Sequence, residues 1–368
     1  MHPAAGYVPQ YDGQCMRLLA IAALGICACG APSASSPSQT LVTAGGEGEQ
    51  RIADLRTCTL DSGERIDECK VGYRTFGKLD AKKSNAILFP TWFTGTTANL
   101  VDFVPEKLVD TKRFFLILVD AIGDGVSSSP SNSRTQPRLK FPHFTIHDMV
   151  EMQRRMLREV MNIEHLYAVM GISMGGMQAF EWSVAHPDEV ARVVPIVGSP
   201  QLTSHDLHLW STEIHALEDS AAYAGGNYEG RPPIRAVQDI HWMMLTTPRH
   251  RARETSRDAY AKWAKEREAD TSFDWNDWHR QAEAMLKHDV ARQHPSLEAA
   301  ARSVKAKMLV VVADQDHAVE PDPAKAFAKA LGDRAELLVL DTDCGHFATV
   351  EGCGRAQIVE RVTKFLEN

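Results

Sequence analysis

The chain has 368 residues, of which 44% are hydrophobic and 24% are charged, and its formal net charge is −8 at pH 7. This length suits one large α/β domain with a sizeable insertion, or two modest domains. No Lys- and Arg-rich stretch is interleaved with aromatic residues, which argues against a nucleic-acid partner. The sequence also predicts no helix that would span a bilayer in the mature chain.

The N-terminal segment has the pattern of an export leader. From Met16 a short positive region, an apolar run and small residues follow one another, so we expect residues 1–29 to form a leader that starts at Met16. Cys29 follows a small residue, as in a bacterial lipobox, whereas Cys27 follows a bulky one. Cys29 is therefore the lipidation candidate; simple cleavage that leaves it unmodified is the alternative. The Ser-, Pro- and Gly-rich stretch over residues 30–50 is typical of a flexible tether.

This leader predicts an exported protein, either periplasmic or a cell-envelope lipoprotein of a bacterium. Its only membrane contact would then be a lipid anchor at Cys29.

Four cysteines follow the leader. Cys58 and Cys69 lie in CTLDSGERIDEC, which predicts two strands around a Ser-Gly turn. Cys344 and Cys353 flank the stretch that contains His346. An even number of cysteines in an exported chain favours two local disulfides, and four free buried cysteines are the alternative. Without a matching second cluster, Cys344 and His346 do not predict a metal site.

From residue 51 onward, short apolar runs alternate with amphipathic stretches. Runs that are apolar on both faces predict central strands of a parallel sheet, here 86–92, 113–120, 165–171, 192–198, 307–314 and 335–341. Helices are predicted over 145–162, 175–186, 322–331 and 354–366. This alternation predicts an α/β core with a mostly parallel central sheet and helices on both faces, in two parts over 51–200 and 301–368.

Residues 201–300 interrupt this alternation. They contain no clear buried strand, their periodicity is helical, and they are rich in Trp, His and Met. We therefore expect a helical insertion after the sixth core strand, in the position of a lid.

A G-x-S-x-G pattern runs from Gly171 to Gly175, between a predicted strand and a predicted helix. This is the context of a nucleophile elbow, and it predicts the α/β-hydrolase fold with Ser173 as the nucleophile. The turn is too tight for side chains at Gly171 and Gly175. The Ser173 hydroxyl would then stand at a helix N-terminus, where backbone N–H groups favour a developing oxyanion. A bystander Ser in a Gly-rich turn is the alternative.

A serine hydroxyl needs a base, and in this fold the chain order is Ser, then Asp or Glu, then His. Asp314 and Asp316 follow one predicted strand and His346 follows the next, so all lie at the sheet edge of Ser173. We choose Asp316 over Asp314 as the acid that orients His346. Asp316 is the fourth residue of the turn Ala313-Asp314-Gln315-Asp316, and the pattern of this fold places the acid at that position.

The oxyanion donors are expected to be backbone N–H groups. Met174 follows the nucleophile, and the second donor should come from the loop after the third strand, FPTWFTGTTANL. We choose Phe93, with Trp92 as the alternative.

At this point the sequence resembles the homoserine O-acetyltransferase family of the α/β-hydrolase superfamily. The resemblance rests on YRTFGKLDAKKSNAILFPTWFTGT, FPHFTIHDMVEMQRRML, GISMGGMQAFEWSVAHPDEV and GHFATVE, in order over about residues 66–366. DGVSSSPSNS is similar to a divergent, hydrolase-like branch. The family transfers an acyl group from a CoA thioester through an acyl-serine. The resemblance implies that Ser173, Asp316 and His346 carry over, that no metal or organic cofactor is needed, and that a homodimer is possible.

The chain departs from this family at two positions that recognise the amino acid. Family acetyltransferases follow the catalytic His with an Asp that holds the homoserine amine, where this chain has Phe347. They also place an Arg in the lid for the carboxylate, where this chain has Ile240-His241-Trp242-Met243, with Arg231 and Arg235 close by. Each charge-assisted contact is worth ~1.5–3 kcal/mol, so losing both predicts loss of amino-acid recognition.

The sequence therefore predicts an exported serine hydrolase that acts on a small-molecule ester or acyl substrate. Export favours hydrolysis, since acetyl-CoA is cytoplasmic. An acyltransferase of the homoserine O-acetyltransferase type and a non-catalytic binding protein on a hydrolase scaffold are the alternatives.

Overall fold

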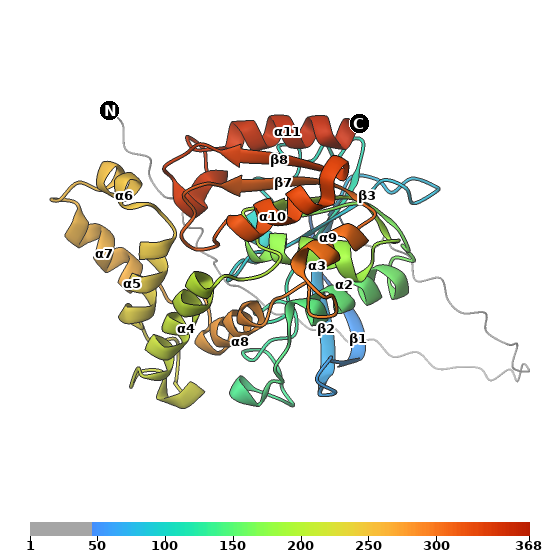
Figure 1. The fold of residues 1–368 in the computed structure, drawn as a ribbon. Helices are drawn as coiled ribbons and strands as arrows, with labels where there is room; N and C mark the ends of the chain where they lie inside the picture. The colour runs from blue at the N-terminus through green and yellow to red at the C-terminus, as the bar shows by residue number, and fades with distance from the viewer. Residues whose placement is uncertain (1–45) are drawn as a thin grey trace, which may run out of the picture. The chain divides into compact units, whose positions relative to one another are not determined.

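The computed structural model describes residues 46–368. The predicted leader with its start at Met16 and the lipidation candidate Cys29 lie outside the described residues. The described chain forms one eight-stranded sheet in the order β1-β2-β4-β3-β5-β6-β7-β8 (Figure 1). β1 and β2 are antiparallel, β2 and β4 are antiparallel, and the other neighbours are parallel. This is the predicted mostly parallel α/β-hydrolase sheet, and the predicted fold class is confirmed.

Each predicted central strand is present with ends shifted by a few residues. The strands are β1 (Arg51–Thr59), β2 (Arg65–Phe76), β3 (Ala86–Pro90), β4 (Phe115–Val119), β5 (Leu166–Ile172), β6 (Val190–Ile196), β7 (Lys307–Ala313) and β8 (Ala335–Leu340). Every residue of β3 and β4 is buried, because helices cover both faces of the sheet there. β3 ends at Pro90, two residues before the predicted end, and the chain then turns into the loop that contains Phe93.

Helices pack on both faces of the sheet. The helices of the core are α1 (Thr97–Leu100), α2 (Ile146–Glu159), α3 (Met174–Ala185), α9 (Leu297–Ser303), α10 (Asp322–Leu331) and α11 (Arg355–Glu367). Met156 of α2, Phe180 of α3 and Phe327 of α10 belong to one buried apolar cluster, whereas Ile358 and Val362 of α11 belong to a second. Figure 1 shows α10 and α11 on opposite sides of β7 and β8.

The insertion between β6 and β7 is helical, as its periodicity predicts. It contains α4 (Ser204–Glu218), α5 (Arg235–Met244), α6 (Pro248–Glu254), α7 (Tyr260–Glu268) and α8 (Trp275–Leu286). The predicted limit of residue 300 falls inside α9, which packs against α10 and α3 rather than against the lid helices. We therefore assign α9 to the core layer, where its fully buried Ala300 and Ala301 allow close packing.

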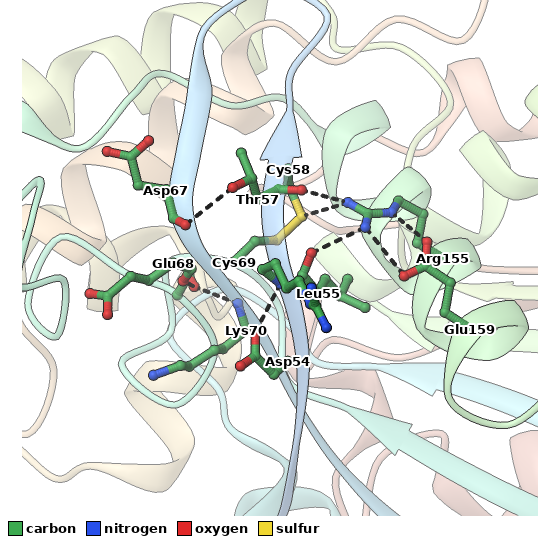
Figure 2. Close-up of a disulfide and its surroundings, with 12 residues drawn as sticks. Asp54, Leu55, Thr57, Cys58, Asp67, Glu68, Cys69, Lys70, Arg155 and Glu159 are labelled. Atoms are coloured by element: carbon green, nitrogen blue, oxygen red, sulfur yellow. Dashed lines mark hydrogen bonds and ion pairs between the residues drawn. A yellow bond between two sulfur atoms is a disulfide. The ribbon is translucent and has the colours of Figure 1, made fainter. Parts of the chain in front are cut away.

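A disulfide between Cys58 and Cys69 joins β1 to β2, with a Cα–Cα distance of 5.6 Å (Figure 2). Arg155 of α2 donates hydrogen bonds to the carbonyl oxygens of Thr57, at 2.9 Å, and Leu55, at 3.2 Å. The disulfide thus ties the two strands of the hairpin together, and Arg155 ties the hairpin to α2. Among residues 46–368, no helix has the length and apolar character needed to cross a membrane.

A buried ion pair ties the end of α3 to the chain that returns from the lid. The Glu181 side chain is 2% exposed, lies 2.7 Å from His147 Nδ1, and accepts two hydrogen bonds from Arg292, at 2.7 and 2.9 Å. Burial alone would raise the pKa of Glu181, but the bonds from His147 and Arg292 lower its pKa to about 2. The ionised Glu181 carboxylate therefore stabilises the packing of α3 against the chain that returns from the lid.

We predict that Glu181→Gln lowers the free energy of unfolding at pH 7 by about 3 kcal/mol, because it leaves Arg292 without its counter-charge. The folded pKa of Glu181 is depressed below its ordinary value of 4.5, so its contribution is present above that pH and is lost as pH falls toward 2. Urea unfolding at a series of pH values should show the wild-type and variant curves converging between about pH 5 and 2. Glu360→Gln, at an exposed position, is the control; a difference that stays constant with pH would contradict the assignment.

Candidate active site

Ser173 lies in a strained turn between β5 and α3. Its φ is 56° and its ψ is −121°, a region that a residue with a side chain rarely adopts. The turn needs glycine on both sides. A Cβ at Gly171 would lie 2.2 Å from the Gly175 carbonyl oxygen, and a Cβ at Gly175 would lie 2.6 Å from the Pro90 carbonyl oxygen. These close approaches present Ser173 at the start of α3, as the G-x-S-x-G pattern predicts.

The structure brings Ser173, His346 and Asp316 together in a chain of hydrogen bonds. His346 Nε2 lies 2.8 Å from Ser173 Oγ, and His346 Nδ1 lies 2.7 Å from Asp316 Oδ2. The other oxygen of Asp316 accepts hydrogen bonds from the N–H groups of Ala318, at 2.9 Å, and Val319, at 3.0 Å. These two bonds hold Oδ1 of the buried carboxylate in place, so that Oδ2 points at the imidazole.

Asp314, the weaker candidate for the acid, lies elsewhere. Its side chain is 59% exposed and forms an ion pair with Lys325 at 2.6 Å. Both Asp residues follow β7, but only Asp316 is within hydrogen-bond distance of His346.

The candidate oxyanion donors lie beside Ser173. The backbone N–H groups of Met174 and Phe93 have no acceptor among the described residues, and the same holds for Trp92. The next N–H, that of Thr94, is already bonded to Gln281 Oε1 at 3.0 Å. The backbone N–H groups that are available to an oxyanion beside Ser173 are therefore those at the start of α3 and in the first residues after β3.

Two buried glutamines that the sequence did not single out hold these donors. Gln178 of α3 donates to the carbonyl oxygens of Thr91, at 3.1 Å, and Met174, at 3.2 Å. Gln281 of the lid helix α8 holds Thr94 and also donates to Ile122 O at 3.2 Å. Neither glutamine is solvent exposed, so each links two backbone segments across the interior.

His346 lies on a short loop that is closed by a second disulfide. Cys344 and Cys353 are joined, with a Cα–Cα distance of 6.1 Å, and the 3-10 helix Gly345–Thr349 lies between them. His250 of α6 lies close to both sulfurs, and this is the only group of three candidate metal-ligand side chains among residues 46–368. Because the sulfurs are bonded to each other, the group is not free to hold a metal ion.

A cavity of about 390 Å³ opens above Ser173 and His346. Its walls are largely aromatic and aliphatic: Trp92, Phe93, Phe103, Ile172, Trp210, Trp242, Leu245, Phe347 and Val350. No Asp or Glu of the described residues lines it. Phe347 packs edge-on against Trp242, with ring centroids 5.9 Å apart, so the position after His346 is part of an apolar wall.

The two lid arginines noted from the sequence do not line this cavity. Arg231 is exposed and donates to Ser272 O at 2.7 Å, and Arg235 is also exposed. Two basic residues that do line it are His241 of α5 and Arg355 of α11. Arg355 is stacked over the Phe103 ring at 4.4 Å and donates to Thr349 O at 2.9 Å.

Comparison with known proteins identifies the family of the fold. A family model described as "alpha/beta hydrolase fold" matches residues 86–352. The chain is 36% identical over 196 residues to the Corynebacterium glutamicum protein named "Probable esterase Cgl0839", and 34% identical over 204 residues to the ethyl acetate hydrolase of Pseudomonas veronii. These matches cover 52% and 54% of this chain and 56% and 58% of the two relatives, so they span little more than half of each protein.

A longer match is to the homoserine O-acetyltransferase of Acidiphilium cryptum, at 30% identity over 340 residues, covering 78% of this chain and 88% of that one. Among solved structures, an acetylester hydrolase from Corynebacterium glutamicum superposes with a TM-score of 0.80 at 28% identity, over 87% of this chain and 96% of that one. The chain therefore belongs to the alpha/beta hydrolase fold family. The predicted resemblance to the α/β-hydrolase superfamily, with a homoserine O-acetyltransferase among the relatives, is confirmed.

We predict that Gly171→Ala displaces Ser173, because the added methyl would overlap the backbone of Gly175. The expected cost exceeds about 3 kcal/mol, since the backbone must shift to relieve the clash. Thermal unfolding and the rate of covalent labelling at Ser173 measure the two effects.

Gly230→Ala is the matched control, because nothing lies within 4 Å of its added methyl and only its positive φ of 65° carries a cost, about 1 kcal/mol. Equal behaviour of the two variants would show that the elbow does not need a glycine at residue 171.

Proposed function

We propose that this enzyme is an exported serine hydrolase of carboxylic esters, with Ser173, His346 and Asp316 as its catalytic residues. The observation that carries the proposal is the hydrogen-bond chain from Asp316 through His346 to Ser173 Oγ, which lies at the base of an apolar cavity. In this arrangement the base can take the proton of the hydroxyl and the carboxylate orients the base, as nucleophilic catalysis by a Ser-His-Asp triad requires.

In the proposed reaction, Ser173 Oγ attacks the ester carbonyl carbon while His346 Nε2 takes the hydroxyl proton. The negative charge on the carbonyl oxygen is stabilised by the N–H groups of Met174 and Phe93. The C–O bond to the alcohol then breaks, and His346 gives its proton to the departing alcohol. Water then attacks the carbonyl carbon of the acyl-serine while His346 Nε2 takes a proton from it. The bond between the acyl group and Ser173 Oγ breaks, His346 gives the proton to Oγ, and the carboxylic acid leaves. Asp316 orients His346 and stabilises its cationic form throughout.

The cavity favours a neutral ester over an amino acid as substrate. An ammonium group would have no carboxylate partner in the described lining, and it would face the Phe347 and Trp242 rings. An uncompensated charge in such a wall is costly to desolvate. The names of the Corynebacterium and Pseudomonas relatives, an esterase and an ethyl acetate hydrolase, support the same substrate class.

Export is supported by the cysteines. The described chain contains two disulfides, Cys58–Cys69 and Cys344–Cys353, and such bonds persist in oxidising compartments. Together with the leader pattern, they support a periplasmic or envelope location with Cys29 as the anchor.

We expect a fluorophosphonate probe to label the wild-type protein and not Ser173→Ala, since the probe reacts only with an activated serine. Ser62→Ala, at an exposed turn position, should label as the wild type does. Ester hydrolysis should be lost in Ser173→Ala and should be indifferent to acetyl-CoA and homoserine. Release of CoA that depends on homoserine would instead show an acyltransferase. A wild-type protein that is not labelled, hydrolyses no ester and releases no CoA would contradict both enzymatic assignments.

We expect Asp316→Asn to lower kcat on the order of 10⁴-fold, because an amide that donates to His346 Nδ1 would hold the imidazole in the wrong tautomer. Asp314→Asn is the matched control, two residues away on the same strand end, and should stay within a fewfold of the wild type. Steady-state kinetics on one ester would separate the two, and equal losses would remove Asp316 from its proposed role.

A further inference from the structure

A second histidine–carboxylate pair lies in the lid. Glu213 of α4 is fully buried, and its Oε1 lies 3.1 Å from His241 Nδ1 of α5. Its other oxygen, Oε2, has no hydrogen-bond partner among the described residues. No Lys or Arg in residues 46–368 lies within 4.0 Å of this carboxylate. His241 is thus the only charged or chargeable group paired with it.

Burial restricts the protonation states of this pair. A Glu213 carboxylate beside a neutral imidazole would leave a net negative charge in the interior without the two backbone N–H bonds that stabilise Asp316, and this is costly. Two states avoid it: a carboxylate with a cationic imidazole, and a protonated carboxyl that donates to Nδ1 of a neutral imidazole. In both states the proton on the far side of the ring is carried by His241 Nε2. The buried glutamate therefore makes Nε2 a hydrogen-bond donor.

This donor has no protein acceptor. His241 Nε2 makes no hydrogen bond within the described chain, and the side chain, 13% exposed, lines the cavity above Ser173. The ring is held among aromatic neighbours: its centroid lies 4.8 Å from Trp278 and 5.9 Å from Phe93. Phe93 is also the proposed source of an oxyanion N–H, so His241 lies one ring away from the reacting centre.

We propose that His241, oriented by Glu213, is a specificity-determining residue that donates a hydrogen bond to a second oxygen of the substrate. This assignment rests on the proposed ester hydrolase function and narrows its substrate class. The substrate would be an ester with an additional acceptor oxygen, such as an ether, keto or hydroxyl oxygen, in the part that enters the lid. A site built to donate a buried hydrogen bond discriminates against analogues that lack the acceptor, because its donor is then left unpaired.

The test compares esters that differ only by replacement of one CH₂ with oxygen. Pentyl acetate and 2-ethoxyethyl acetate place the change in the alcohol; methyl pentanoate and methyl 3-methoxypropanoate place it in the acyl group. For each, kcat/KM is measured with the wild type and with His241→Leu, and taking the ratio of the two enzymes cancels the intrinsic reactivity of the ester. In one of the two pairs, the loss on substitution should be about tenfold greater for the oxygenated ester.

A matched control is available in His186, whose Nε2 lies 2.6 Å from Glu151 Oε1 and which does not line the cavity. His186→Leu removes the same kind of pair and should leave both preferences unchanged. If His241→Leu changes oxygenated and hydrocarbon esters equally in both pairs, His241 has no such role and the proposal is overturned.

A measurement without substrate separates this proposal from the proposed function. Nitrogen-15 NMR of histidine-labelled wild-type protein, with the His241 signals assigned from His241→Leu, reports which ring nitrogen carries a proton. A proton on Nε2 near pH 7 is expected, and an unprotonated Nε2 would overturn the proposal whether or not the enzyme hydrolyses esters. A protein that turns over no ester would contradict the hydrolase assignment and with it the proposed recognition, while the NMR result would still decide the state of the pair.

Discussion

The close approach of two backbone segments at the start of α3 determines where everything else in the site can lie. The Gly171 Cα lies so near Gly175, and Gly175 so near Pro90 O, that neither position tolerates even a methyl group. The positive φ of Ser173 is the cost of this turn, and the burial of α3 between β5, β6 and α2 stabilises it. With the turn fixed, Ser173 Oγ lies within hydrogen-bond distance of His346 Nε2. The loops after β7 and β8 then meet it at the same sheet edge, because parallel strands end together.

Buried polar side chains make this arrangement rigid. Gln178 holds the chain after β3 against the first turn of α3, and Gln281 holds the same loop against the lid. Gln153 continues the first link, since it donates to Gln178 at 2.6 Å and accepts from Trp182 at 2.8 Å. A satisfied buried network specifies one geometry, whereas a partly satisfied one would be costly. The lid helix α8 is therefore a structural support of the loop that follows β3.

Much of the fold and the reacting centre could be predicted from the sequence because their signals are local. Apolar runs predicted each central strand, and the G-x-S-x-G pattern together with strand ends predicted Ser173, Asp316 and His346, which the structure brings within hydrogen-bond distance of one another. The supports were not predictable, because each joins residues far apart: Thr94 and Gln281 are separated by 187 positions, and Glu213 and His241 by 28. A buried Gln or Glu in a helix has no local pattern that indicates its partner. The sequence also could not show that α9 packs in the core layer and not in the lid, because its seven residues have the same helical pattern in either place.

The residues that line the cavity, and not the hydrogen-bonded residues at its base, are where this chain differs from the amino-acid acetyltransferases that it resembles. In the proposed reaction, the hydrogen-bond chain through His346 would act on any acyl carbonyl alike, so selectivity between substrates would come from the cavity walls. Here the position after His346 is an aromatic ring packed on Trp242, which removes the means of holding an ammonium group. The lid retains one polar pair, Glu213 and His241, within an aromatic cluster where apolar residues of similar size would pack without a desolvation cost. A buried carboxylate with one unpartnered oxygen contributes little to stability. In the proposed role, Glu213 orients a hydrogen-bond donor on His241, which lines the cavity, and an apolar replacement could not supply this donor.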